Sequence, residues 1–165
     1  MFYVVVNWIM KELNSYIFES NFNEALKLIK AGNGVNEKYG IGIRPIIAAI
    51  NSDIPECLRF VIQNGADVNI DSGQPLHEVI DYCIDGMIQN NRSEPYPEAL
   101  QMLQILLDNG ADLQIENKNR KRPIDLITAY SHNQESFERL KSIFRPLIPQ
   151  IDELIKGNLY KHDFI

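Results

Sequence analysis

The sequence reads Asn64-Gly65-Ala66-Asp67-Val68-Asn69 directly after an apolar run, and nearly the same six residues return as Asn109-Gly110-Ala111-Asp112-Leu113-Gln114. A more divergent copy, Ala31-Gly32-Asn33-Gly34-Val35-Asn36, lies upstream. The turn glycines are therefore Gly32, Gly65 and Gly110, and the second interval between them is longer than the first. The first interval has the length of a structural repeat, and such a period indicates a repeat protein. The longer second interval indicates one repeat that is expanded by an insertion.

A proline-containing hexapeptide follows each turn glycine, and the middle one follows at a shorter distance than the other two. Proline is favoured at the first position of a helix, and glycine just past a helix end, where a left-handed conformation is needed. Each unit therefore predicts a helix, a short turn, a second helix, a glycine turn and a polar finger loop that leads to the next proline. The hexapeptides are Arg44-Pro45-Ile46-Ile47-Ala48-Ala49, Gln74-Pro75-Leu76-His77-Glu78-Val79 and Arg122-Pro123-Ile124-Asp125-Leu126-Ile127.

These hexapeptides resemble the Thr-Pro-Leu-His-x-Ala opening of the ankyrin repeat, and the resemblance covers roughly residues 12–145. Arg44, Gln74 and Arg122 replace the usual Thr, and His occurs only at His77. The resemblance implies that His77 is structural and hydrogen-bonds to neighbouring loops. It also implies one all-α domain, 1–165, built as an ankyrin-repeat solenoid of about four helix-turn-helix repeats: 10–41, 42–71, 72–119 and 120–145, with a C-terminal cap and tail at 146–165.

Apolar spacing predicts the helices of these repeats. In the third repeat, the stretch from Pro75 to Gly110 is considerably longer than the matching stretch from Pro45 to Gly65 in the second. We expect its first helix to reach about Asn90 despite Gly86, with a loop at 91–97. The apolar stripe of that helix comprises Leu76, Val79, Ile80, Cys83, Ile84, Met87 and Ile88. The remaining helices are expected near 10–19, 22–31, 45–52, 55–63, 97–109, 123–131, 135–144 and 151–156.

Composition favours a protein partner over nucleic acid or a membrane. The chain has 165 residues, 45% of them hydrophobic, and a formal net charge of −6. A nucleic-acid ligand would require a basic stripe, and the one basic run, Lys118, Arg120, Lys121 and Arg122, is expected to be a solvated finger loop. Cys57 and Cys83 fall on apolar stripes, which favours reduced core thiols and a cytoplasmic protein.

The two ends of the chain leave alternatives open. Residues 1–10 are apolar but lack a basic start and a cleavage site, and they are too short to span a bilayer. They either extend the chain upstream of a start at Met10 or pad the end of the stack through Phe2, Tyr3 and Val4. The C-terminal tail is either a lid on the last repeat or a partner contact, through Leu159, Tyr160, Phe164 and Ile165.

No catalytic motif is present in the sequence. The run Gly40-Ile41-Gly42-Ile43 lacks the third glycine and the preceding strand of a dinucleotide loop. No Cys/His cluster has zinc spacing, and no paired motif supports a hydrolase that uses Asp and Glu carboxylates. We therefore expect a protein that is not an enzyme and that requires no cofactor or metal.

The candidate binding site lies opposite the apolar stripe of the expanded helix, where an exposed face is expected to carry three acids around one aromatic ring. In ankyrin proteins the first helices and the fingers line the concave surface that grips partners. Asp71 and Glu116 come from the flanking fingers, and Tyr96 from the inserted loop. The alternative is an ordinary solvated helix face. The predicted partner-binding residues are Glu78, Asp81, Tyr82, Asp85, Gln89, Tyr96, Asp71 and Glu116.

The predicted function is therefore a non-catalytic protein-binding module. Its size, acidity and content of Ile and Asn resemble a free-standing ankyrin protein of bacterial type, in which immunity is a recurrent role. Such a protein would occlude a cognate, basic toxin or enzyme through its acidic concave surface. The alternative is an adapter or host-directed effector that docks a regulatory protein. A monomer is the default oligomeric state.

Overall fold

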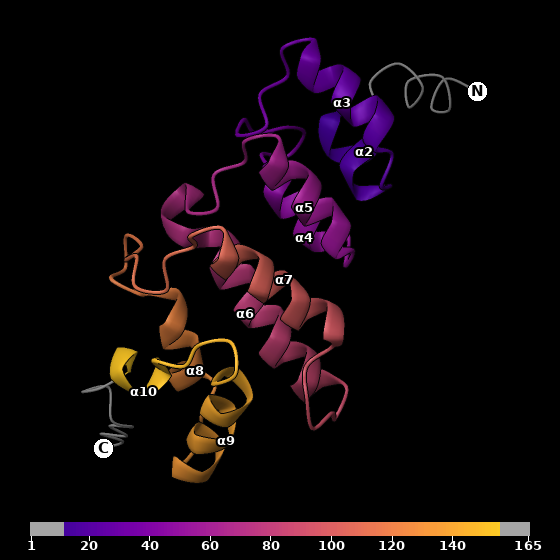
Figure 1. The fold of residues 1–165 in the computed structure, drawn as a ribbon. Helices are drawn as coiled ribbons and strands as arrows, with labels where there is room; N and C mark the ends of the chain where they lie inside the picture. The colour runs from indigo at the N-terminus through magenta and orange to yellow at the C-terminus, as the bar shows by residue number, and fades with distance from the viewer. Residues whose placement is uncertain (1–11, 156–165) are drawn as a thin grey trace.

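A computed structural model describes residues 12–155, which are helical apart from an isolated bridge between Tyr39 and Ile43 and the connecting turns and loops. The helices follow one another in pairs along the molecule (Figure 1). This arrangement confirms the all-α class. In chain order the elements are α2 (Leu13–Phe18), α3 (Phe22–Lys30), α4 (Pro45–Asn51), α5 (Pro55–Gln63), α6 (Ile70–Gln89), α7 (Pro97–Asp108), the 3-10 turn η1 (Pro123–Asp125), α8 (Leu126–Ala129), α9 (Gln134–Phe144) and α10 (Ile151–Leu154).

The helix pairs stack in two rows. In one row α2 packs on α4, α4 packs on α6, and α6 packs on η1 and α8. In the other row α5 packs on α7. The two rows contact each other within each pair, because α4 packs on α5 and α6 packs on α7. One continuous core therefore runs along the stack.

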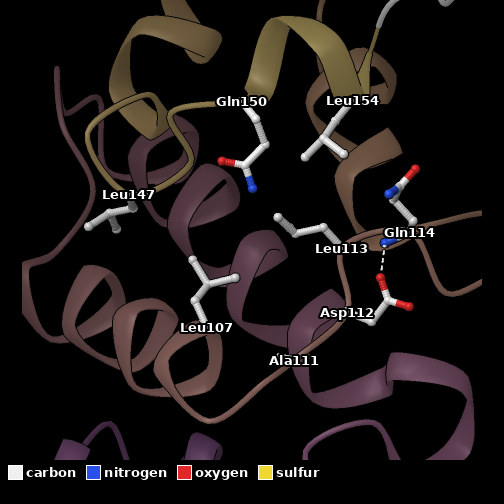
Figure 2. A pocket seen from close by; sticks show the side chains of 8 residues that line it. All are labelled: Leu107, Ala111, Asp112, Leu113, Gln114, Leu147, Gln150 and Leu154. Atoms are coloured by element: carbon white, nitrogen blue, oxygen red, sulfur yellow. Dashed lines mark hydrogen bonds between the residues drawn. The ribbon is translucent and has the colours of Figure 1, made fainter.

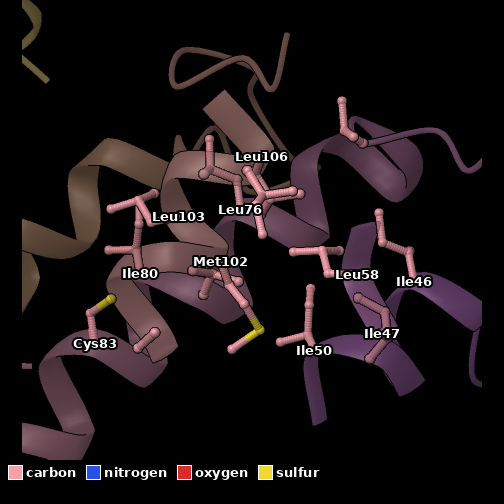
Figure 3. Close-up of a cluster of buried hydrophobic side chains, with 14 of the residues drawn as sticks. Ile46, Ile47, Ile50, Leu58, Leu76, Ile80, Cys83, Met102, Leu103 and Leu106 are labelled. Carbon is pink, nitrogen blue, oxygen red and sulfur yellow. The ribbon is translucent and has the colours of Figure 1, made fainter. Parts of the chain in front are cut away.

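Side chains from the two rows interdigitate in that core (Figure 3). All the apolar residues of α4 are buried, because α2 and α6 cover it on both sides. Cys57 and Cys83 are buried and free, so the prediction of unpaired core thiols is confirmed. Side chains that meet in this region include Ile46, Ile47, Ile50, Leu58, Leu76, Ile80, Cys83, Met102, Leu103 and Leu106.

The turn glycines adopt the left-handed conformation that their position predicts. The φ angles of Gly32, Gly65 and Gly110 are 101°, 95° and 83°. Each glycine follows directly on the last turn of a helix, where a residue with a Cβ is strained. The glycine turns therefore end α3, α5 and α7 as expected.

An asparagine after each of the first two turns links neighbouring helix pairs. Asn36 Nδ2 donates to Gly65 O at 2.9 Å, and Asn36 Oδ1 accepts from Asp67 N at 2.8 Å. Asn69 makes the same two bonds to the next turn, to Gly110 O at 3.0 Å and from Asp112 N at 2.8 Å. This role of the two asparagines was not predicted from the sequence.

The connection between Gly65 and Pro75 does not form the finger that the sequence analysis expected. Both other connections fold back on themselves, through the Tyr39–Ile43 bridge and a bond from Asn117 N to Lys121 O. The shorter connection instead turns through three left-handed residues, 71–73, that lead directly into the regular part of α6. It is too short to contain a hairpin as well.

Gly73 is required in this compressed turn. Its φ is 79°, and a Cβ built on it would lie 2.4 Å from Ile115 Cγ2 of the next connection. Asp71 is fixed there by Arg44, whose Nε and Nη2 lie 2.5 and 2.7 Å from its two carboxylate oxygens. The turn therefore depends on partners from both neighbouring connections.

The helix α6 ends at Gln89, close to the predicted end at about Asn90. The absence of a side chain at Gly86 leaves room for the ring of Tyr96: a Cβ at this position would lie 3.3 Å from Tyr96 Cδ2, which is a tight contact. Ile88 is 55% exposed, so its assignment to the buried stripe was wrong. The next helix starts at Pro97, after an exposed loop in which Pro95 is buried.

The last helix pair departs from the pattern of the others. η1 and the short α8 replace a single first helix, and α9 packs less closely on α7 than α7 packs on α5. Asp152 of α10 is tied back to α9 by Lys141 and Arg145, both at 2.9 Å. The alternatives for Met1, Met10, Phe2, Tyr3 and Val4, and for the tail at Leu159, Tyr160, Phe164 and Ile165, lie outside the described residues.

Candidate functional site

A hollow of about 350 Å³ lies between the C-terminal end of α4 and the middle of α6. Four of its lining side chains are carboxylates and none is basic: it is lined by Ile50, Asn51, Asp53, Glu78, Asp81, Tyr82 and Asp85. We call it the acidic groove. It brings together four of the eight residues predicted for partner binding. It adds Asp53, which occupies the turn after α4 with a left-handed φ of 58°.

The carboxylates on α6 are half-buried and held by neighbours, rather than fully exposed as expected. Tyr130 Oη donates to Asp81 Oδ1 at 2.5 Å, across 49 residues of sequence. Gln74 Nε2 donates to Glu78 Oε1 at 3.3 Å. Asp85 accepts a hydrogen bond from Gln89, which therefore supports the groove without lining it. The charges have fixed positions, which lowers the entropic cost of binding.

Two aromatic rings stand at the side of the groove. The rings of Tyr82 and Tyr96 are stacked with centroids 6.3 Å apart, and the Arg92 guanidinium lies 4.2 Å from the centroid of the Tyr96 ring. Burial, followed by the Asp53 carboxylate, raises the pKa of Tyr82 to about 12. The hydrogen bond to Asp81 likewise raises the pKa of Tyr130. Both phenols are therefore protonated at neutral pH and can donate hydrogen bonds.

The two predicted finger residues lie elsewhere. Asp71 forms the ion pair with Arg44, which lowers the pKa of its carboxyl, and it does not line the groove. Glu116 is exposed in the third connection, near enough to Arg122 to contribute to the raised pKa of that guanidinium. Arg122 is itself half-buried and paired with Asp125 at 2.6 Å, so the expectation that the whole basic run is solvated was wrong at this residue.

A second hollow, of about 330 Å³, adjoins the acidic groove on its N-terminal side. It lies between α2 and α4 and shares Asn51 with the groove. We call it the apolar pocket, because Phe18, Ile43 and Ala48 form much of its surface. The complete lining is Asn14, Ser15, Phe18, Glu19, Ile43, Ala48 and Asn51. This pocket was not predicted from the sequence.

A third hollow, of about 270 Å³, lies near α10 (Figure 2). Its apolar walls come from α7, the turn after it and the segment around α10. The carboxylate of Asp112 accepts a hydrogen bond from Gln114 N at 2.8 Å, so it serves the turn. The lining residues are Leu107, Ala111, Asp112, Leu113, Gln114, Leu147, Gln150 and Leu154.

The resemblance implies that His77 hydrogen-bonds to neighbouring loops. Its side chain lies near the backbone of Lys121 in the following connection, its Nε2 has no hydrogen-bond partner among the described residues, and burial lowers its pKa. Within residues 12–155, no three potential ligand side chains are placed to hold a metal ion. No helix of that range has the length and hydropathy needed to cross a membrane.

Comparison with known proteins gives one informative similarity. Ankyrin repeat and SOCS box protein 9 from Homo sapiens is 32% identical to this chain over 85 residues, which are 50% of this chain and 24% of the human protein. The similarity supports an ankyrin-repeat relationship. This chain thus covers about a quarter of that relative's length. No family model matches the chain. The relationship agrees with the resemblance of the proline hexapeptides and glycine turns.

Proposed function

We propose that the chain is a non-catalytic ankyrin-type stack that binds a protein partner in the acidic groove. In this proposal the single domain spans 1–165, and the third of its four repeats carries the insertion. The observation that carries the proposal is the groove itself, with four carboxylates and no basic side chain in its lining. The repeats are 10–41, 42–71, 72–119 and 120–145, followed by a cap and tail at 146–165.

The partner that fits such a groove is basic. Complementary charge speeds association and disfavours wrong partners. In its specific form, the proposal is that the chain is an inhibitor or immunity protein of bacterial type, monomeric and cytoplasmic, that covers the active site of a basic toxin or enzyme. The net charge of −6 supports long-range attraction to such a partner.

Aromatic anchors complement the charges in this proposal. Tyr82 and Tyr96 present stacked rings beside the acids, and tyrosine is enriched among the residues that dominate binding energy. The insertion supplies Tyr96 and lengthens α6, and loops that depart from a repeat often lie on its binding face. Gln89 supports Asp85, whereas Asp71 and Glu116 are proposed as outer contacts.

The test compares the wild type with two variants of equal charge change. The groove variant carries Glu78→Lys and Asp85→Lys. The control variant carries Asp108→Lys and Glu153→Lys, which replace exposed residues at the end of α7 and within α10. Asp81 is left unchanged because it accepts the hydrogen bond from Tyr130.

Each protein is tagged and used to recover partners from the source cell. We expect one protein to be recovered by the wild type and the control variant but not by the groove variant, and its activity to fall to zero at a 1:1 ratio with the wild type. Equal recovery by the groove variant would reject the groove. A partner that binds but stays fully active would reject occlusion and would favour an adapter or host-directed effector that docks a regulatory protein.

A further inference from the structure

The apolar pocket and the acidic groove are adjacent hollows that share one lining residue, Asn51. Both lie on the row of helices α2, α4 and α6, one on each side of α4, and Asn51 at the end of α4 lines both. A partner segment that crosses the end of α4 would therefore contact both hollows.

The apolar pocket has the features of a side-chain anchor site. Phe18 at its rim is 53% exposed, although it is a large apolar residue. The pocket wall is fixed, because Asn14 Nδ2 donates to Ile43 O at 2.9 Å and so joins α2 to the segment before α4. Its volume of about 330 Å³ exceeds the roughly 150 Å³ that is enough for a benzene ring in an apolar cavity.

The charge of the acidic groove restricts the occupant. Asp53, Glu78, Asp81 and Asp85 line the groove, and its lining contains no Lys or Arg. A purely apolar segment would leave the negative charge of the groove without a complement. A segment that combines an apolar side chain with a cation satisfies both halves.

The spacing of the helices determines how far apart the apolar side chain and the cation of the partner segment must lie. Packed helices lie about 8–10 Å apart, so hollows on the two sides of α4 are offset by about 10 Å. An extended peptide advances about 3.3–3.6 Å per residue, and therefore covers this offset in about three residues.

We infer that the two hollows are a bipartite site for an extended partner segment that carries an aromatic or large aliphatic side chain about three residues from an arginine or lysine. The apolar side chain enters the pocket beside Phe18 and Ala48, and the cation lies between Asp53 and Asp85 in the groove. This inference rests on the proposed function and specifies the chemistry of the segment that the partner presents.

The test uses synthetic peptides and amide chemical shifts of the isotopically labelled full chain. The probe is acetyl-Gly-Phe-Ala-Ala-Arg-Gly-amide, together with the same sequence reversed. Matched peptides replace Phe by Ala, replace Arg by Gln, or place Phe and Arg next to each other. We expect the better of the two spaced peptides to bind at least about tenfold more tightly than any matched peptide, and to shift the amides of Phe18, Ala48 and Asp85.

Variants of the chain then test which hollow binds the apolar side chain and which binds the cation. Phe18→Ala should reduce binding of the spaced peptide to the level of the peptide without Phe. Ile88→Ala should leave it unchanged, because Ile88 is similarly exposed, at 55%, but lines neither hollow. If the Arg peptide shifts the groove amides and Phe adds nothing, the bipartite site is rejected while the groove stands. If no peptide shifts the groove amides, both this inference and the proposed groove are rejected.

Discussion

The glycine turns and the acidic groove use the same residue types for different purposes. In the turns, Asp67 and Asp112 each accept a hydrogen bond from the backbone two residues later, both at 2.8 Å. In the groove, Glu78 and Asp85 line a hollow instead. The carboxylates of the turn aspartates bind backbone N–H groups of their own turns, so they stabilise the helix stack.

The repeat register explains this difference. Asp67 and Asp112 occupy the same position after their turn glycines. Glu78, three residues after Pro75, corresponds to Ala48 and Leu126 after the other two prolines. The turn aspartates thus recur at matched positions, whereas Glu78 has no acidic counterpart, and the proposed function assigns partner binding to acids that are confined to one unit.

The largest expected effect is on the free energy of unfolding, and it distinguishes two of the left-handed glycines. Gly73→Ala should lower the free energy of unfolding by about 2–4 kcal/mol, because it adds a clash with Ile115 to the left-handed strain. Gly110→Ala should cost about 1–2 kcal/mol from strain alone, since no atom lies within 4 Å of its Cβ position. Urea denaturation measures both, and equal losses would contradict the close contact at Gly73.

The asparagine links provide the next largest effect. Asn69→Ala removes two hydrogen bonds between neighbouring turns, and should lower the free energy of unfolding by about 1–3 kcal/mol. Gln114 occupies the matched position after Gly110, and its side chain makes no such link within residues 12–155. Gln114→Ala should therefore change stability by about 0.5 kcal/mol or less. A similar loss in both variants would show that the links do not stabilise the stack.

The sequence was sufficient to predict features that depend on local signals. Pro45 and Pro97 start helices where they were expected to, and Gly65 and Gly110 end them. Apolar periodicity predicted a helix that reaches about Asn90, and α6 ends at Gln89. These features depend on residues within one or two helical turns, so a single sequence contains enough information.

Features that depend on distant contacts were not predicted. The close approach of Ile115 to Gly73 and the hydrogen bond from Tyr130 to Asp81 both join residues that are far apart in the sequence. The apolar pocket is formed by α2 and α4 together, so neither segment reveals it alone. The asparagine links were within reach, because Asn36 and Asn69 occupy matched positions after their turn glycines.

A smaller effect concerns pH and the contact between α6 and the third connection. Burial holds the pKa of His77 below its ordinary 6.5, so the unfolded chain binds this proton more readily than the folded one. The resulting stability is present above pH 6.5 and is lost as the pH falls through the folded pKa. Thermal melting at about pH 7.5 and about pH 5.0, on either side of the ordinary pKa of 6.5, should show a greater loss of stability for the wild type than for His77→Gln. Identical losses would contradict a buried neutral imidazole.

The smallest effect on stability is expected in the groove. Each of Glu78→Lys and Asp85→Lys should change the free energy of unfolding by about 0.5 kcal/mol or less, since neither residue belongs to the core or the turn links. Thermal melting checks this expectation against the variant with Asp108→Lys and Glu153→Lys. A large loss in the groove variant alone would mean that these acids stabilise the fold.

Calorimetric titration of the purified partner, at low and at moderate salt, tests the central claim that the acidic groove binds a basic protein. The wild type and the control variant should bind with the same affinity, and that affinity should weaken as salt increases. The folded groove variant should lose at least about 100-fold in affinity, because like charges replace attraction. Wild-type affinity and salt dependence in the groove variant would contradict the claim.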